Sequence, residues 1–185
     1  MKTLRIVLAG LMFAATVATV AHVAADDRDN DRDNRLRTSL KGFNEVPIVS
    51  TEASGRLMAQ ISKDEQTIEY TLTINDLQGI VAQAHIHLAQ RDVNGGIVLW
   101  LCQGTARAPA QVAANTPECP QEGEVSGMLT AASVTPVATQ QIGANELGEV
   151  IAAIRAGKAY ANVHTNLSPG GEMRGQIDAD HGGHR

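Results

Sequence analysis

Residues 67–74 read TIEYTLTI, and this stretch decides the fold class. Its apolar side chains, Ile68, Tyr70, Leu72 and Ile74, alternate with polar ones. Successive side chains of an extended chain point to opposite sides, so the alternation gives the segment one apolar and one polar face. The stretch therefore predicts a half-buried antiparallel β-strand.

The same pattern recurs on both sides of this stretch, in short segments separated by turns rich in Gly, Asn, Asp and Pro. The further predicted strands are residues 36–43, 55–62, 83–89, 97–102, 124–130, 159–165 and 173–177. About eight short strands predict an all-β fold, a Greek-key β-sandwich or barrel. Aromatic residues make up only 3% of the chain, so aliphatic side chains must build most of the core.

One segment has helical rather than strand periodicity. Its apolar residues recur at i, i+3, i+4 and i+7, which places them on one face of a helix. They are Leu147, Val150, Ile151 and Ile154. Asn145 can cap the N-terminus, and Gly157 can end the helix in a left-handed turn. We therefore predict one short helix within residues 145–157.

The beginning of the chain has the pattern of a signal peptide. Lys2 and Arg5 precede an apolar run over residues 6–21, and small residues follow that run. A run of about sixteen residues is short for the roughly twenty that span a bilayer. We predict a cleaved signal peptide over residues 1–25; the alternative is a retained membrane anchor.

The remainder divides into a charge-dense, disordered lead-in (residues 26–36), one domain (residues 37–178) and a flexible tail (residues 179–185). The leader carries basic but no acidic residues, so its removal makes the net charge more negative than the −5 of the full chain. That charge argues against nucleic acid as a partner. With no second long apolar run, we expect no membrane contact after cleavage and an extracytoplasmic protein, periplasmic or secreted.

Cys102 and Cys119 are the two cysteines of the chain. In an oxidising compartment such a pair typically forms a disulfide. The bond would close a loop of about seventeen residues, which stabilises a fold by roughly 3 kcal/mol in chain-entropy models. The alternative is two thiols that stay separate or bind a metal.

Three of the six histidines lie inside the predicted domain. His85 and His87 stand at i and i+2, so on a strand both project from one face about 7 Å apart. His164 lies on another predicted strand, and the three imidazoles meet if the two strands are neighbours. Such a set suits Cu(II) or Zn(II), with a fourth position open to water or a small substrate. The alternative is three satisfied or surface histidines that bind no metal.

Three ordered motifs resemble the CHRD domain, the module named for its repeats in chordin. They are LKGFNEVPIVSTEASG (residues 40–55), AHIHLAQRDVNGGIV (residues 84–98) and AGKAYANVHTNLSPGGEMRGQI (residues 156–177). The resemblance covers most of the chain after the leader. It implies an extracellular module of the kind associated with protein–protein contacts.

A more distant resemblance, to copper–zinc superoxide dismutase, rests on AHIH after a glycine turn and on NVHT before a glycine-rich turn and an arginine. It implies a superoxide-dismutase-like Greek-key sandwich, copper ligands at His85, His87 and His164, and an anion-guiding role for Arg174. The structural alternative for Arg174 is a hydrogen bond to Glu45, Glu172 or a backbone carbonyl.

The chain departs from the dismutase pattern because it has no counterpart of the histidine that bridges copper and zinc, and no histidine-rich zinc loop. We therefore expect one ion per chain, copper with zinc as the alternative, and His181 or His184 of the tail as further candidate ligands. Two functions follow. The first is an exported metal-binding protein with redox or superoxide-related activity; the second is a non-catalytic module that binds extracellular proteins without metal. Both an enzyme and a binding protein fit these residues.

Overall fold

The computed structural model describes residues 34–179. The strands are β1 (Arg35–Lys41), β2 (Ser54–Ile61), β3 (Thr67–Asn75), β4 (Val81–Leu88), β5 (Gly96–Gln103), β6 (Gly123–Thr130), β7 (Ala159–Thr165), β8 (Met173–Gln176) and the short β9 (Asp178–Ala179). The helices are α2 (Ala110–Ala113) and α3 (Leu147–Arg155). All eight predicted strands are present, and their bounds agree with the prediction to within a few residues.

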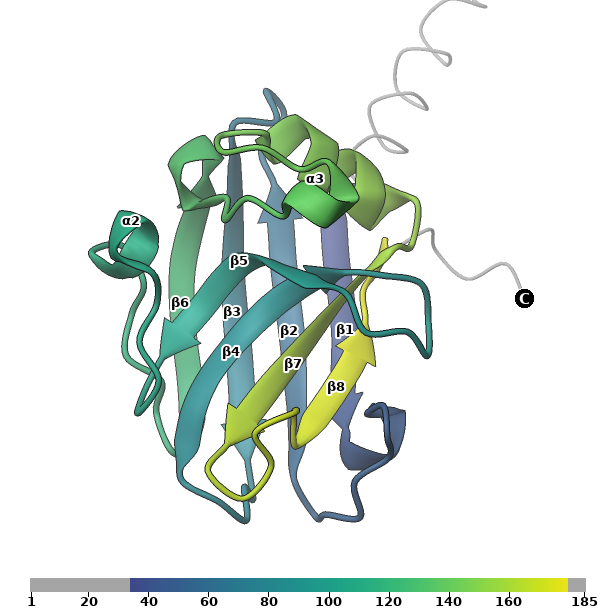
Figure 1. Cartoon of the computed structure of the whole chain (residues 1–185), viewed down its shortest axis with the longest axis vertical. Coiled ribbons are helices and arrows are strands. Elements are labelled where there is room, and N and C mark those ends of the chain that lie inside the picture. The colour runs from purple at the N-terminus through teal and green to yellow at the C-terminus, as the bar shows by residue number, and fades with distance from the viewer. Residues whose placement is uncertain (1–33, 180–185) are drawn as a thin grey trace, which may run out of the picture.

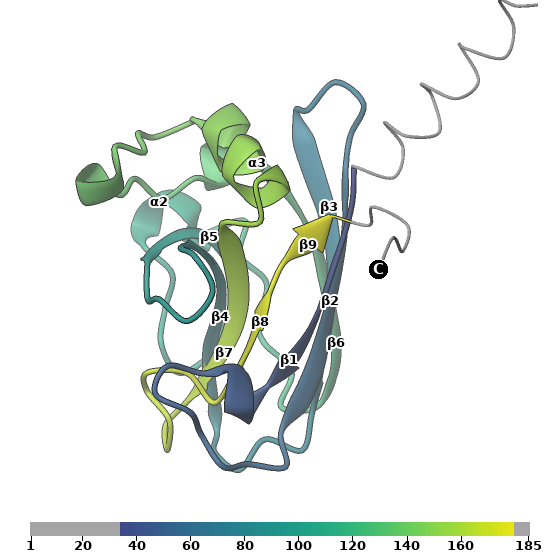
Figure 2. The same cartoon turned by 90° about the vertical axis from the view of Figure 1, so that its right-hand side faces the viewer.

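The strands form one antiparallel sheet with the order β5-β4-β7-β8-β1-β2-β3-β6, and β9 adds to β1. The sheet curls into a nearly closed barrel of two facing layers, one containing β4, β5 and β7 and the other β1, β2, β3 and β6 (Figures 1 and 2). The pairs β3–β6, β4–β7 and β1–β8 join strands that are not consecutive in sequence, as a Greek key requires. The predicted all-β Greek-key fold is confirmed.

Inward-facing residues of both layers fill the barrel with a single large aliphatic core. On β3 the side chains of Ile68, Leu72 and Ile74 are fully buried, as the alternation in residues 67–74 predicts. Helix α3 covers one end of the barrel (Figures 1 and 2) and adds the four apolar residues of its inner face to the same core. Strand alternation and helix periodicity therefore meet in one hydrophobic cluster.

The structure corrects several details of the sequence prediction. β1 begins at Arg35, inside the predicted lead-in, and β9 includes the first residue of the predicted tail. A second short helix, α2, lies in the loop that separates the cysteines. Asn145 does not cap α3: it has a φ of 65°, and Glu146 occupies the cap position without a side-chain hydrogen bond. Gly157, with a φ of 67°, takes the predicted left-handed conformation.

Cys102 and Cys119 form a disulfide, as predicted, so neither is a free thiol or a metal ligand. The bond attaches the loop before β6 to β5, at the edge where the barrel does not close by strand pairing. The backbone N–H of Cys119 also donates to the carbonyl of Gln103, and the N–H of Gln103 donates to the carbonyl of Pro117. The loop is therefore fixed along the free edge of β5.

The predicted signal peptide, most of the lead-in and the tail histidines His181 and His184 lie outside the described residues. Within residues 34–179, no helix has the length and apolar character needed to cross a membrane.

Candidate metal centre

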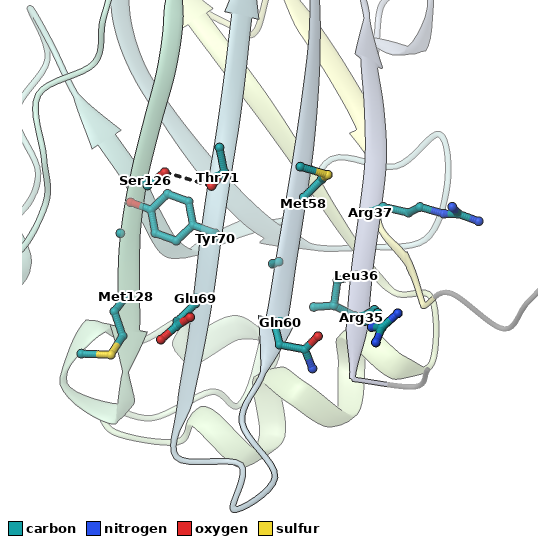
Figure 3. A pocket seen from close by; sticks show the side chains of 12 residues that line it. Arg35, Leu36, Arg37, Met58, Gln60, Glu69, Tyr70, Thr71, Ser126 and Met128 are labelled. Carbon is teal, nitrogen blue, oxygen red and sulfur yellow. Dashed lines mark hydrogen bonds between the residues drawn. The ribbon is translucent and has the colours of Figure 1, made fainter. Parts of the chain in front are cut away.

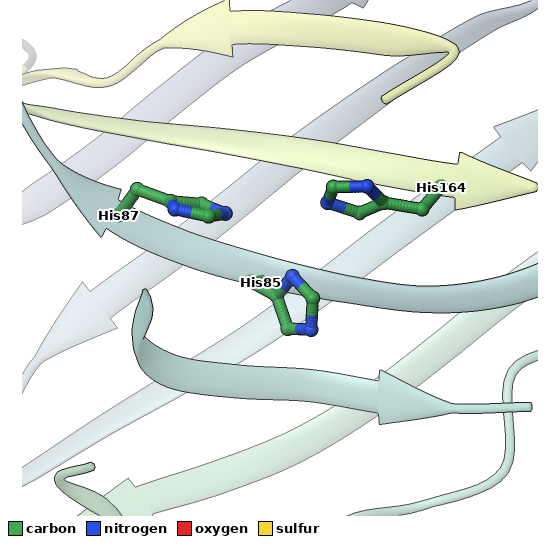
Figure 4. Close-up of side chains that lie close together, drawn as sticks. All are labelled: His85, His87 and His164. Carbon is green, nitrogen blue, oxygen red and sulfur yellow. The ribbon is translucent and has the colours of Figure 1, made fainter. Parts of the chain in front are cut away.

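His85, His87 and His164 come together on two neighbouring strands (Figure 4). β4 carries the first two and pairs antiparallel with β7, which carries the third. One nitrogen of each imidazole lies within 4.8 Å of the other two. An ion about 2 Å from each nitrogen needs them at most about 4 Å apart, so the rings would have to move slightly closer to bind it. The convergence predicted from the spacing of the histidines is confirmed.

The cluster lies on the outer face of the barrel, yet it is buried. Ile86 points into the core, so the alternation of β4 turns the histidines on either side of it outward. Loops cover them there, leaving His85 0%, His87 6% and His164 7% exposed. Register shifts in the pairing of β4 with β5 fall on both sides of His85, and such bulges re-aim side chains next to functional sites.

His87 is held in one tautomer by a backbone contact. Its Nδ1 lies 2.9 Å from the carbonyl oxygen of Gly95, so Nδ1 carries the proton and donates it. Its Nε2 is buried and has no hydrogen-bond partner. A metal-binding histidine typically donates its second N–H to a carbonyl in this way, which leaves the other nitrogen free for the ion.

His164 shows the same arrangement on β7. Its Nδ1 lies 2.9 Å from the carbonyl oxygen of Pro169, and its Nε2 lies 3.0 Å from Oδ1 of Asn162. A neutral imidazole has a single N–H, and the Pro169 carbonyl accepts it, so Nε2 keeps a lone pair. The Asn162 amide can turn its NH₂ end toward that lone pair, because the two ends have nearly the same shape. His164 therefore also has an unprotonated Nε2, but the Asn162 amide must release this nitrogen before an ion can bind it.

His85 has the least satisfied side chain of the three. Both of its ring nitrogens are buried without a hydrogen-bond partner. Its ring makes an edge contact with Trp100 of β5 at a centroid distance of 4.2 Å, and it lies 5.0 Å from the ring of His164. An unpaired buried polar group costs on the order of 1–3 kcal/mol, and an ion bound between the rings would remove that cost for one of the two nitrogens.

Electrostatics favour the neutral form of all three imidazoles. Burial lowers the pKa of His87 to about 4 and lowers the pKa of His164. Burial, together with repulsion from His164 and His87, lowers the pKa of His85 well below its usual value. At neutral pH each ring thus keeps a lone pair, which is the form that binds metals. The residues present fit a His₃ site for a divalent transition metal.

Arg174, the predicted anion guide, lies beside the cluster but not in it. Its guanidinium lies 3.4 Å from the ring centroid of Tyr160, and the Tyr160 ring stacks on His87 at 4.7 Å. Its terminal nitrogens donate to the carbonyl of Val93 and to the side chain of Asn94. Arg174 is only 2% exposed, and its hydrogen bond to the Val93 carbonyl is the structural role considered as the alternative to anion guiding. The anion-guiding role stays a prediction.

Two further groups lie near the site: Trp100, which follows the second sequence motif, and Glu45, which lies within the first. Trp100 is the chain's single tryptophan and packs with Ala108 and Val112 in a second, smaller hydrophobic cluster, so the α2 segment covers the His85 side of the site. Glu45 is buried next to Asn162 and Gly171, and burial raises the pKa of its carboxyl to about 7. The only sequence signal for Trp100 is its place in the predicted strand 97–102; in the structure that strand pairs with the one that carries His85.

A groove lies elsewhere on the barrel. It has a volume of about 800 Å³ and runs over the outer face of β1, β2, β3 and β6 (Figure 3), where Met58 and Met128 are half exposed. Among the described residues that line it there is no histidine or cysteine. The groove therefore offers neither imidazole nor thiolate; its soft donors are the thioethers of Met58 and Met128, which suit Cu(I) rather than a divalent ion. The histidine cluster is the better candidate for a divalent metal.

An all-β Greek-key barrel with three converging histidines on its outer face defines a class of small β-barrel domain with a candidate metal site. Residues 36–177 match the model of the CHRD domain family, and the chain belongs to that family. No curated protein and no solved structure matches the chain. The resemblance to copper–zinc superoxide dismutase thus rests on sequence motifs and has no support from a structural neighbour.

Proposed function

We propose that this CHRD-domain protein is exported and binds one copper ion per chain through His85, His87 and His164. One observation carries the proposal: three buried, neutral imidazoles converge, and His87 Nε2 and both nitrogens of His85 have no other partner. Buried polar atoms without partners are rare in folded proteins. A bound ion accounts for His87 Nε2 and for one nitrogen of His85.

The donor set favours copper, with zinc as the alternative. Imidazole nitrogens bind both ions, and copper lies above zinc in the affinity order of divalent metals. When bound, copper supplies one-electron redox chemistry. The protein's own contribution is to hold the rings at fixed tautomers, to exclude water with Trp100 and the covering loops, and to place the Arg174 charge behind Tyr160. We propose that the bound copper gives the protein a redox or superoxide-related activity.

The disulfide supports export. Disulfides form and persist in extracytoplasmic compartments and are rare in reducing ones, and the Cys102–Cys119 bond links a buried strand to a surface loop. Together with the signal peptide predicted over residues 1–25, this bond supports a periplasmic or secreted protein.

A second function, binding of extracellular proteins without metal, is favoured by exposed apolar side chains on the loop between β1 and β2. Phe43 is 67% exposed and Ile48 is 68% exposed. Single exposed apolar side chains are normal at a protein surface, so it is the position of both residues on one loop that marks the loop as the candidate contact. The two functions make opposite predictions about copper.

The decisive experiment is a Cu(II) titration of the exported, processed protein, followed by electron paramagnetic resonance. The test variant is His85→Ala/His87→Ala. The matched control, His181→Ala/His184→Ala, removes the same number of imidazoles and also tests whether the tail adds a ligand. We expect one tight equivalent with nitrogen coupling in the wild type and the control, and its loss in the test variant. Absent binding, or binding unchanged in the test variant, contradicts the proposal and leaves the protein-binding function.

A further inference from the structure

Three flat groups from three adjacent strands are stacked behind the candidate site. The strand order β4–β7–β8 puts Tyr160 between His87 and Arg174. The rings of His87 and Tyr160 are nearly parallel, with an angle of 3° and a centroid distance of 4.7 Å. The Arg174 guanidinium lies 3.4 Å from the Tyr160 ring centroid. The position of each group thus depends on the next.

The same arginine fixes the loop between β4 and β5. One terminal nitrogen of Arg174 donates to the carbonyl of Val93 at 2.8 Å, and the other donates to Oδ1 of Asn94 at 3.0 Å. The NH₂ group of Asn94 in turn donates to the carbonyl of Val46. Two consecutive loop residues are therefore held by a single buried guanidinium.

The next residue of this loop, Gly95, makes the contact that sets the tautomer of His87. Its carbonyl accepts the Nδ1 proton of His87, and its N–H lies 3.3 Å from the Tyr160 hydroxyl oxygen, to which it donates. A β-carbon at this position would come within 1.9 Å of the carbonyl oxygen of Leu88. Only glycine lets the loop backbone pass this close to Leu88, the residue after His87.

We infer that Arg174 and Tyr160 are positioning residues for His87. They act through residues 93–95: Arg174 holds Val93 and Asn94, Tyr160 holds Gly95, and the Gly95 carbonyl keeps the proton on Nδ1 of His87. The lone pair on Nε2 then stays directed toward His85 and His164. This inference rests on the proposed metal site for its purpose, but the tautomer it describes exists in the metal-free protein.

The inference also gives Arg174 a role that its burial permits. Both of its terminal nitrogens and one face of its guanidinium are occupied by protein groups. Tyr160 separates it from the ring of His87. Partners that orient a metal-binding histidine typically change metal affinity by 10- to 100-fold when they are removed.

The test measures the His87 tautomer directly, by nitrogen-15 and proton NMR of the metal-free protein labelled on histidine. The resonances of His87 are assigned by their loss in His87→Gln. Arg174→Lys keeps the charge but loses the planar group that makes two hydrogen bonds and the stack. Tyr160→Phe keeps the ring and removes only the hydroxyl. Arg56→Lys, the same exchange at an exposed position of β2, is the control.

We expect a single Nδ1–H tautomer with slow proton exchange in the wild type and in Arg56→Lys. In Arg174→Lys we expect both tautomers, proton exchange at least about tenfold faster, and a 10- to 100-fold loss of copper affinity. Tyr160→Phe should shift the same quantities in the same direction by less. If Arg174→Lys does not fold, Tyr160→Phe decides alone.

A folded variant with an unchanged tautomer and unchanged exchange overturns the inference. The result is separable from the proposed function. A tautomer change in a protein that binds no copper upholds the positioning role and rejects the copper site. Tight copper binding by the wild type, with no tautomer change in Arg174→Lys, supports the copper site and rejects the positioning role.

Discussion

The ring of Tyr70 on β3 lies against the α-carbon of Gly127 on β6, so closely that a β-carbon there would come within 2.5 Å of the tyrosine oxygen. The Tyr70 hydroxyl donates to the carbonyl of Leu101 on β5. β5 and β6 are the two ends of the strand order and do not pair along their length. The missing side chain of Gly127 therefore lets one tyrosine bridge the open edge of the barrel.

Replacing Gly127 with alanine should destabilise the barrel. The added methyl group meets Tyr70 in a packed interior, and overpacking of this kind costs about 1–3 kcal/mol. Chemical denaturation measures the effect. Gly148→Ala is the matched control, because a β-carbon there meets nothing within 4 Å on helix α3, and an alanine in a helix should stabilise by about 0.5–1 kcal/mol. Equal effects of the two variants would contradict the tight contact.

Replacing Tyr70 with phenylalanine should cost about 1–3 kcal/mol, because the Leu101 carbonyl loses the hydroxyl that satisfies it in a buried position. The ring stays, so the loss reports the hydrogen bond and not the packing. Hydrogen exchange of β5 and β6 amides should speed up more than that of β1 and β2. Uniform changes across the barrel would mean that the bond does not close this edge in particular.

Removing the disulfide should loosen the loop over Trp100. The variant Cys102→Ala/Cys119→Ala is expected to lose about 3 kcal/mol of stability, the entropy of closing a loop of this length. Since the chain has one tryptophan and the loop packs on it through Val112, its fluorescence should shift to the red in the native variant. An unshifted spectrum would show that packing alone holds the loop.

The pH dependence of stability should change when Glu45 is replaced with glutamine. Burial raises the pKa of this carboxyl from 4.5 to about 7, so between these values the folded protein binds more protons than the unfolded chain. Its contribution to stability therefore falls as pH rises through this range, by about 1.4 kcal/mol for each unit of raised pKa.

Glu45→Gln removes this dependence. Its stability relative to the wild type should improve as pH rises from about 4.5 to 7 and stay level above that. Denaturation midpoints at a series of pH values measure it, with the exposed Glu69→Gln on β3 as control. A constant difference between Glu45→Gln and the wild type at every pH would show that the carboxyl has an ordinary pKa.

Copper should quench the emission of Trp100 and stabilise the fold. The Trp100 ring lies 4.2 Å from the ring of His85, a ligand of the proposed site. A paramagnetic Cu(II) ion bound there should therefore quench the fluorescence, whereas Zn(II), with its filled d shell, should not. At a free concentration one hundred times the dissociation constant, either ion should add about 2.7 kcal/mol to stability. A chelator should reverse both effects. Quenching that persists in His85→Ala/His87→Ala would place the copper elsewhere.

Most of the fold can be read from the sequence because each strand obeys the two-residue period. The stretch 67–74 and the HxH of β4 are examples: in both, alternation alone assigns each side chain to a face. α2 has no such signal, because four residues make too short a pattern. Asn145 is a residue type that often caps helices, but here its backbone is left-handed and it does not cap α3.

The three ligands of the candidate site are also readable, but their surroundings are not. His85, His87 and His164 stand out by residue type and spacing. Gly95 and Pro169 contribute carbonyl groups, which every residue has, and Glu45 reaches the site from a loop far away in sequence. Such contacts depend on how loops close over the barrel, and no local pattern encodes that.

Ile86 and His87 are adjacent in sequence, yet they belong to different parts of the molecule, one to the barrel interior and the other to its outer face. Substitutions that alter the ligands leave the aliphatic interior untouched, and substitutions that repack the interior leave the ligands in place. Natural variation can therefore exchange or delete the metal ligands of this domain while the barrel persists. A family with this fold can hold both metal-binding members and members that bind only other proteins.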